Sequence, residues 1–244
     1  MLHLHHLANS RSFRIIWLLE ELGADYKLTC YERNKAYRAP DSLKQVHPIG
    51  NAPILETDDR VLIESGFIIE YLIKHYDKEK QFKPDDNNEA AWEAYTFWLH
   101  FAEASLMPLL VMRLVFTKVV SQSPMLIKPI SKKIQGQIEK NMISSGLEKM
   151  LDMMERHLHE NHWFAGSEFS AADIQMHLAV VGANAGAGLD QSKYTNLLNW
   201  LKRCEERDAF KRAEKKGRPS EFLEDTGIIL SQRLSSHVDQ RLCL

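Results

Sequence analysis

Cysteine is scarce in this sequence. The three cysteines, Cys30, Cys204 and Cys243, lie far apart, and none belongs to a CxxC pair. An odd number of isolated cysteines argues against a disulfide scaffold and against a zinc ribbon, and it is typical of a reducing compartment. The expected location is therefore cytoplasmic.

Long apolar runs and a strong net charge are also missing. The 31 Lys and Arg residues nearly balance the 33 Asp and Glu residues, which does not favour nucleic acid or an anionic membrane as a partner. The opening MLHLHHLANS lacks the features of a secretory signal. The longest apolar stretch, 106–120, is interrupted by Pro108, Arg113 and Lys118, so no membrane span is expected. What is present is an ordinary globular composition, 44% hydrophobic and 26% charged, in a chain long enough for one large or two modest domains.

The first 80 residues alternate strand-like and helix-like segments. Apolar residues alternate in the strand-like segments and recur at helical spacing in the others, and Gly23 suits the end of the first helix. The turn residues TDDR favour a hairpin between the third and fourth strands. The predicted order is β-α-β-α-β-β-α, over residues 2–7, 12–22, 25–31, 42–46, 53–56, 61–63 and 65–76.

No strand signal follows Pro84. Asp85 or Asp86 is predicted to cap a long helix, and Pro108 is predicted to kink it because proline removes a backbone hydrogen bond. Further helices are expected over 134–159, 171–182 and 195–213, with an interruption at 121–131 and an unassigned tail from Thr226. The charged stretch 77–83 has the character of a linker. The fold class is thus α/β plus all-α, with domains at 1–80 and 84–244.

Three junctions between these elements carry polar residues. Ser10 and Arg11 precede the first helix, whose N-terminus favours an anion. The alternative is that Ser10 or Ser12 only caps the helix, worth about 1 kcal/mol. Pro53 could be cis and expose the backbone of Ala52, or be a plain turn proline.

The third junction is Glu64-Ser65. Ser65 is expected to cap the following helix, whose N-terminus could hold a ligand carboxylate while Glu64 meets an ammonium group. Capping alone is again the alternative.

Taken together, these segments resemble the glutathione transferase family. The matching stretches are SRSFRIIWLLEELG, HPIGNAPIL and LIESGFIIEYL in the first half and WFAGSEFSAADI in the second, and they cover nearly the whole chain in the family's order. The sequence of these stretches is most similar to that of serine-type fungal and bacterial enzymes of the yeast Gtt kind. The resemblance implies a thioredoxin-like glutathione-binding domain at 1–80 and an all-helical domain with the electrophile pocket at 84–244. In the second half, Ser170 and Asp173 match the family's capping box.

The resemblance also implies roles for individual residues. Ser10, in Ser-x-x-x-Arg with Arg14, matches the serine that stabilises the glutathione thiolate, and Arg11 adds charge. The Ala52 backbone, before Pro53, would pair with the cysteinyl part of glutathione. The remaining binding positions implied are Glu64 and Ser65 for the γ-glutamyl end and, less closely matched, His47 and Asn51 for the glycyl carboxylate.

The function implied is transfer of glutathione, a co-substrate, to small hydrophobic electrophiles in detoxification. A free thiol has a pKa of roughly 8.5, and one hydroxyl donor to the thiolate would lower it by roughly one to two units. A glutathione-dependent peroxidase and a non-catalytic binding module on the same fold stay open as alternatives. The electrophile pocket is expected at Met107, Val111, Met112 and Phe116. A homodimer is also implied, in which an acid such as Glu103 would serve the partner chain's site.

No metal site is expected. His3, His5 and His6 lack the regular zinc spacing. His157, His159 and His162 suit the negative end of a helix.

Overall fold

A four-stranded sheet forms the first part of the molecule. The computed structural model describes residues 1–34 and 36–217. Strands β1 (Leu2–Leu7), β2 (Tyr26–Tyr31), β3 (Ile54–Glu56) and β4 (Val61–Ile63) lie in the order β2-β1-β3-β4. β1 runs parallel to β2 and antiparallel to β3, and β3 and β4 form the predicted hairpin.

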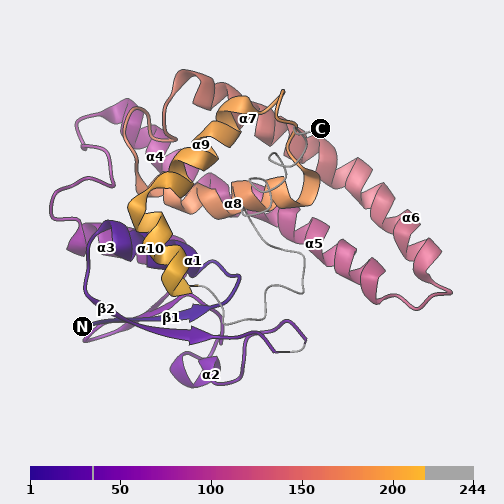
Figure 1. Ribbon diagram of the computed structural model, residues 1–244, viewed down its shortest axis with the longest axis horizontal. Helices are drawn as coiled ribbons and strands as arrows, with labels where there is room; N and C mark the ends of the chain where they lie inside the picture. The colour runs from indigo at the N-terminus through magenta and orange to yellow at the C-terminus, as the bar shows by residue number, and fades with distance from the viewer. Residues whose placement is uncertain (35, 218–244) are drawn as a thin grey trace, which may run out of the picture.

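Helices cover both faces of this sheet (Figure 1). α1 (Phe13–Glu21) and α3 (Ser65–Tyr76) lie on one face, and the short α2 (Leu43–Val46) lies on the other. Alternate residues of β1 point to opposite faces. Leu2 and Leu4 enter the main core with α1 and α3, whereas Leu7 packs with Leu43 of α2. The predicted β-α-β-α-β-β-α order is confirmed.

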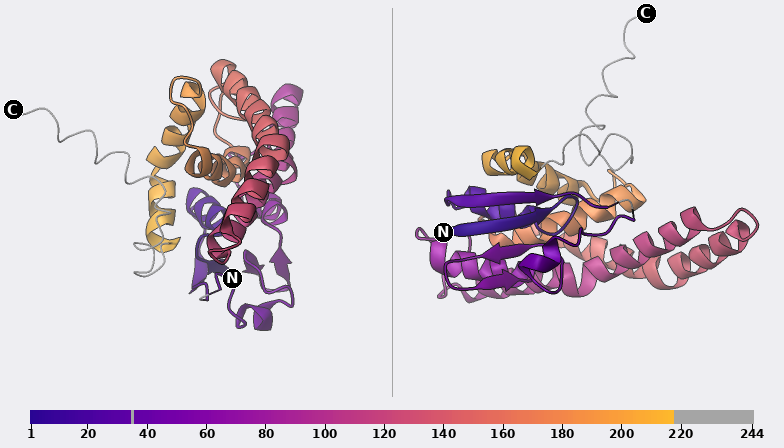
Figure 2. Two further views of the ribbon diagram at one scale, coloured as in Figure 1. Left: turned by 90° about the vertical axis from the view of Figure 1, so that its right-hand side faces the viewer. Right: turned by 90° about the horizontal axis from the view of Figure 1, so that it is seen from below.

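Helices alone make up the rest of the described chain. α4 (Glu89–Phe101), the π-helical segment η1 (Ala102–Leu106) and α5 (Met107–Gln122) follow one another directly, as do α6 (Lys128–Ile138), the π-helical η2 (Glu139–Ser144) and α7 (Ser145–Glu160). The paired ends of α5 and α6 project from the body of the molecule (Figures 1 and 2). The last helices are α8 (Ala171–Ala187), α9 (Thr195–Glu206) and α10 (Asp208–Gly217).

Local chemistry corrects several predicted boundaries. Asn88, not Asp85 or Asp86, caps α4, and its side chain accepts a hydrogen bond from the Ala91 N–H. Pro108 lies in the first turn of α5. It has no N–H to donate to the preceding turn, and that turn adopts the wider π-helical form.

Other helices differ from prediction in their ends. The interruption at 121–131 shortens to 123–127, because Pro129 fits the first turn of α6. The segment 195–213 is two helices, divided at Arg207, whose backbone is extended. α8 continues to Ala187. The tail from Thr226 lies outside the described residues.

Asp173 anchors the centre of the helical part. It is fully buried and accepts hydrogen bonds from Ser170 N at 2.9 Å, Phe164 N at 3.0 Å and Trp200 Nε1 at 2.8 Å. The capping box predicted from Ser170 and Asp173 is therefore present. One carboxylate joins α8, α9 and the preceding loop.

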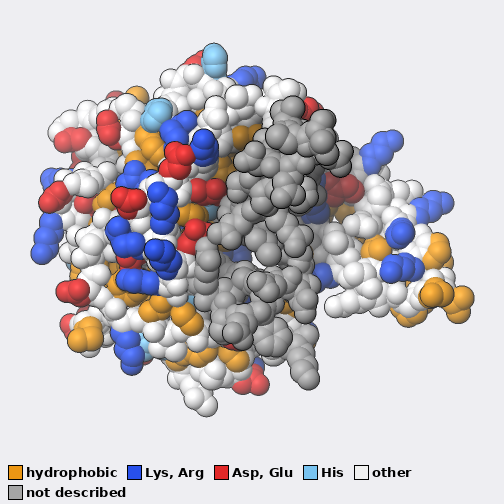
Figure 3. Space-filling view, in the orientation of Figure 1, with side chains coloured by type: hydrophobic (Ala, Val, Ile, Leu, Met, Phe, Trp, Pro, Cys, Tyr) orange, Lys and Arg blue, Asp and Glu red, His pale blue; other side chains and the backbone are white. Residues whose placement is uncertain are grey.

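The helix Glu89–Gln122 is long and apolar enough to cross a membrane by length and composition. In this structure its first half packs into the protein core through Tyr95, Trp98 and Leu99. Its second half exposes apolar side chains along the α5–α6 hairpin. Figure 3 shows hydrophobic side chains gathered at the tip of that hairpin, where Met125 and Leu126 are about nine-tenths exposed.

Candidate active site

The register of the sheet brings the three polar junctions to one end. β1 ends at Leu7, just before Ser10. His5 of β1 pairs with Ile54 of β3, so Ala52 and Pro53 lie beside the end of β1. Ile54 pairs in turn with Ile63, and Glu64 follows directly. Segments far apart in the sequence therefore meet where β1 and β4 end and β3 begins.

The loop that carries Ser10 is held from behind by Arg33. The Arg33 guanidinium donates to the carbonyl oxygens of Ala8 and Asn9, both at 2.9 Å. Asn9 has a φ of 52°, in the left-handed region, where asparagine is tolerated better than most residues. The loop therefore has a fixed path into α1, and Ser10 is left partly exposed.

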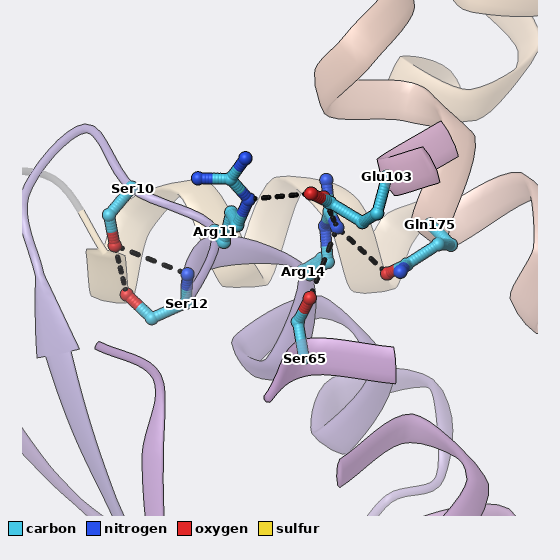
Figure 4. Close-up of polar contacts among 7 residues, drawn as sticks. All are labelled: Ser10, Arg11, Ser12, Arg14, Ser65, Glu103 and Gln175. Carbon is cyan, nitrogen blue, oxygen red and sulfur yellow. Dashed lines mark hydrogen bonds and ion pairs between the residues drawn. The ribbon is translucent and has the colours of Figure 1, made fainter. Parts of the chain in front are cut away.

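Ser12 occupies the N-cap position of α1, but its side chain makes no cap hydrogen bond. The alternative that Ser12 caps α1 is therefore right in position but wrong in mechanism. Its hydroxyl is completely buried and lies 2.8 Å from His6 Nδ1 and 2.6 Å from Ser10 Oγ. It also accepts a hydrogen bond from Leu7 N at 3.1 Å. Ser12 is thus the middle of a polar chain that runs from His6 to Ser10, and Figure 4 shows its outer part, the contact between Ser10 and Ser12.

The direction of the protons in this chain follows from its far end. His6 Nε2 lies 3.1 Å from the carbonyl oxygen of Gly217, which can only accept, so Nε2 carries a proton. Burial lowers the pKa of His6 to about 4, against the opposing effect of the Gly217 carbonyl, so the ring is neutral at pH 7. Nδ1 is then an acceptor, Ser12 donates to it, and Ser10 donates to Ser12. Of the two serines, only Ser10 has a hydroxyl that can turn to a ligand.

Arg11 and Arg14 share one acid. Arg11 Nε donates to Glu103 Oε2 at 2.8 Å, and Arg14 Nη1 donates to Glu103 Oε1 at 2.6 Å. Burial alone would raise the pKa of Glu103, but the two guanidinium groups lower it overall. Glu103, expected to serve a partner chain, is here paired within its own chain, and it offsets the charge that Arg11 brings.

Arg14 joins elements from both parts of the chain. It is fully buried, and Nη1 donates to Ser65 Oγ at 3.2 Å and to Gln175 Oε1 of α8 at 2.8 Å. The prediction that Ser65 caps α3 is wrong. Ser65 is the first residue of the helix, and Glu64, with a φ of 70°, occupies the cap position without a side-chain cap bond. Nη1 has two hydrogens for three acceptors, so its 3.2 Å contact with Ser65 Oγ is a shared hydrogen bond, and Ser65 keeps its own hydroxyl proton to donate.

The remaining predicted binding residues lie on the approach to β3. The Ala52–Pro53 peptide bond is cis, as one reading of the sequence anticipated. His47 follows α2, and its Nδ1 accepts a hydrogen bond from Ile49 N at 3.3 Å. Asn51 is exposed. The junctions at Ser10, at Ala52–Pro53 and at Glu64–Ser65 therefore all place polar groups at this end of the sheet, where an extended peptide could bind.

One face of α5 is directed to the same end of the sheet. Lys118 Nζ lies 4.0 Å above the ring of Tyr37, in the loop after β2. Val111, Leu114 and Val115 share the helical face of Lys118 and are exposed. Prediction named Val111 but missed Leu114 and Val115, although their spacing of i, i+3, i+4 and i+7 with Lys118 was a usable signal.

Two cavities and two cysteine thiols in the described residues lie outside this site. A cavity of about 680 Å³ lies between the 80–94 and 161–170 segments, and one of about 540 Å³ lies beside α3. Neither includes Ser10, Ala52 or Ser65. Burial raises the pKa of both described thiols, Cys30 and Cys204, so neither suits a nucleophilic role.

A thioredoxin-like four-stranded sheet followed by a helical part is the fold of the glutathione transferase class. The model of the glutathione S-transferase N-terminal domain matches residues 1–74, and that of the C-terminal domain matches residues 110–208. The chain belongs to the glutathione S-transferase family and is a glutathione transferase.

Known glutathione S-transferases are similar to this chain over most of its length. Glutathione S-transferase 3 of Schizosaccharomyces pombe is 37% identical over 216 residues, 88% of each chain. Glutathione S-transferase 1 of Saccharomyces cerevisiae is 29% identical over 89% of this chain and 96% of its own. The crystal structure of a glutathione S-transferase from Actinobacillus pleuropneumoniae superposes with a TM-score of 0.73, at 29% identity, covering 89% of this chain and 93% of that one. These relatives fit the fungal, Gtt-like resemblance.

Proposed function

We propose that glutathione binds across the end of the sheet where the three junctions meet, within residues 1–80, and that residues 84–244 supply the electrophile site. The observation that carries this proposal is the register that brings Ser10, Ala52 and Ser65 together. The substrates proposed are glutathione and small hydrophobic electrophiles. The setting proposed is cytoplasmic detoxification by a homodimer without a membrane span.

Ser10 is the proposed thiolate donor. Its hydroxyl leaves Ser12 and turns to the glutathione sulfur, an exchange of one neutral acceptor for a charged one. A hydrogen bond to a charged group is worth roughly 1.5–3 kcal/mol and a neutral one roughly 0.5–1.5 kcal/mol. The net gain of about 1–2 kcal/mol lowers the thiol pKa by roughly one unit. Arg11 acts only at a distance, because Glu103 pairs with it.

The rest of glutathione is held by the neighbouring junctions. The Ala52 backbone, ahead of Pro53, pairs with the cysteinyl unit as an added strand would. Ser65 donates to the γ-glutamyl carboxylate at the N-terminus of α3, where the helix dipole favours an anion. Glu64 is exposed and acidic and receives the ammonium group. His47 and Asn51 stand on the side of the glycyl carboxylate.

The electrophile site is proposed on α5. Val111, Leu114 and Val115 form an exposed apolar strip on the face that reaches Tyr37, and Met107 extends that strip toward the core. Met112 and Phe116 complete the originally expected set but are less exposed. An open strip rather than a closed cavity favours varied apolar substrates.

Titration calorimetry with glutathione tests the binding part. Ser65→Ala removes a donor to a carboxylate, and we expect the Kd to rise about tenfold or more. Glu64→Ala is expected to weaken binding as well. Ser42→Ala, an exposed serine before α2 without a side-chain cap bond, serves as the matched control. If both site variants bind like the parent, the assignment of Glu64 and Ser65 is wrong.

Activity assays separate the remaining functions. Conjugation of an aryl halide supports the proposal, turnover of cumene hydroperoxide alone favours the peroxidase, and neither activity with intact binding favours the binding module.

A further inference from the structure

Two histidines and a glutamate converge on the sheet face opposite α1 and α3. His3 Nδ1 lies 2.9 Å and His5 Nε2 lies 3.0 Å from the same oxygen, Glu56 Oε2. The cause is the pairing of strands. His3 and His5 alternate onto one face of β1, and Glu56 of β3 stands directly opposite His3. The potential ligand atoms of the three residues lie within 4.8 Å of one another.

The outer nitrogen of each ring also has a partner. His5 Nδ1 lies 2.9 Å from the Tyr31 hydroxyl, and His3 Nε2 lies 2.8 Å from Thr29 Oγ1. Both partners come from β2. Metal-bound histidines almost always donate their second N–H to such a group, which fixes the ring and its tautomer. Hydroxyl groups both donate and accept, so Tyr31 and Thr29 accommodate the tautomer that metal binding requires.

The donor set and its surroundings suit zinc. Two neutral imidazoles with one carboxylate form a known catalytic zinc set, in which water takes the open position. His5 is 4% exposed, whereas Glu56 is partly open to solvent. The site thus has a fixed inner wall and an accessible side.

The two distances between histidine nitrogen and carboxylate oxygen require only a small adjustment, and the two histidine nitrogens lie within 4.8 Å of each other. In a tetrahedral site with bonds of about 2.0–2.1 Å, neighbouring ligand atoms lie about 3.3–3.4 Å apart. The present separations of 2.9 and 3.0 Å therefore need to widen by about 0.4 Å. The half-exposed Glu56 side chain can make that movement without displacing either strand.

We propose that His3, His5 and Glu56 form a Zn²⁺ site at the start of β1, with water completing the coordination. The proposal departs from the expectation based on zinc spacing, which did not consider two ligands two residues apart on a strand with a third from the neighbouring strand. The ion would join β1 to β3, at the opposite end of β1 from Ser10. The inference does not depend on how glutathione binds.

Zinc titration of the full, untagged chain tests the site after treatment with a chelator and removal of the chelator. Calorimetry should give one Zn²⁺ per chain, and the melting temperature should rise with added zinc because the ion binds only the folded pair of strands. Glu56→Gln keeps the size of the side chain and removes the anionic ligand, so we expect the Kd to rise about a hundredfold. His5→Gln should give a similar loss.

The control is His100→Gln, which removes an exposed histidine of α4 and should leave zinc affinity unchanged. Glu56 is partly exposed, so its variant folds even if the buried His5→Gln does not. It also separates this site from a pair formed by His3 and the terminal amine, which would survive Glu56→Gln. Stoichiometric binding lost in Glu56→Gln supports the proposal. No binding by the parent chain, or equal binding by parent and Glu56→Gln, overturns it.

Discussion

Replacing Ser10 and Ser12 one at a time separates thiol activation from structural support. Ser10→Ala removes the partly exposed hydroxyl at the outer end of the polar chain. Ser12 still donates to His6 and still accepts from Leu7 N. The loss is confined to the 3.2 Å hydrogen bond that Ser12 N donates to Ser10 Oγ. We therefore expect a smaller fall in the melting temperature than in Ser12→Ala. The thiolate loses about 1–2 kcal/mol, so the pKa of bound glutathione should rise by roughly one unit.

Ser12→Ala has the opposite profile. It leaves His6 Nδ1 and Leu7 N buried without their partner, and each such group costs roughly 1–3 kcal/mol. This exceeds the roughly 1 kcal/mol of a lost cap. For a chain of this size, 1 kcal/mol corresponds to about 2–4 °C, so the melting temperature should fall by roughly 5–15 °C. The thiol pKa should move less than in Ser10→Ala.

The assay is the pH profile of aryl halide conjugation, supported by the ultraviolet absorbance of bound thiolate and a thermal melt. Ser10→Ala should lose about tenfold in rate below the thiol pKa and recover toward the parent at high pH, where the thiol ionises unaided. A raised thiol pKa in Ser12→Ala with an unchanged melt would refute the proton directions derived from His6. Unchanged profiles in both variants would move thiolate stabilisation to Arg11 or the helix N-terminus.

Three further measurements bear on the same framework. Glu103→Gln leaves the buried Arg14 guanidinium without its anion, and denaturant unfolding should report a loss of roughly 3 kcal/mol; a loss below 1 kcal/mol would contradict the pairing. The folded pKa of His6 is about 4, below the ordinary 6.5, so its contribution is complete above pH 6.5 and is lost as pH falls toward 4. It amounts to roughly 3 kcal/mol, and His6→Gln should flatten that part of the stability profile. Light scattering at micromolar concentration should give roughly twice the chain mass of 28.2 kDa; a monomer would contradict the proposed dimer.

The spacing of apolar residues predicted the helices and strands well, because an element that buries one face must place apolar residues at the period of that face. Leu2 and Leu4, or Ile68, Ile69 and Leu72, enter the core as their spacing indicated. The ends of helices were harder, because several residues compete for each cap. Asn88 prevails over Asp85, whose carboxylate instead accepts from Asn87 N. A π-helical turn before Pro108 has no signature in hydrophobic spacing.

The candidate site was predictable at the level of junctions but not of hydrogen bonds. Sequence indicated that Ser10, Ala52 and Ser65 follow or precede strands, and the register gathers them. It did not indicate that Ser12 bonds to His6, because that choice depends on the Gly217 carbonyl 211 residues away. A Cβ on Gly217 would lie 2.9 Å from Ile16 Cδ1, so glycine permits the close approach of α10 on which the proton order rests.

Arg14 explains why neither half of the chain accounts for the site alone. Its guanidinium comes from α1, yet its acceptors are Ser65 of α3, Glu103 of η1 and Gln175 of α8. All three acceptors lie at Nη1, whereas Nε and Nη2 are buried without a partner, so the cost of burying the guanidinium is offset through Nη1 and the charge of Glu103. The orientation of the Ser65 hydroxyl therefore depends on two residues of the helical part. A shift of η1 or α8 would therefore alter the surroundings of Ser65, at the end of the sheet where glutathione is proposed to bind.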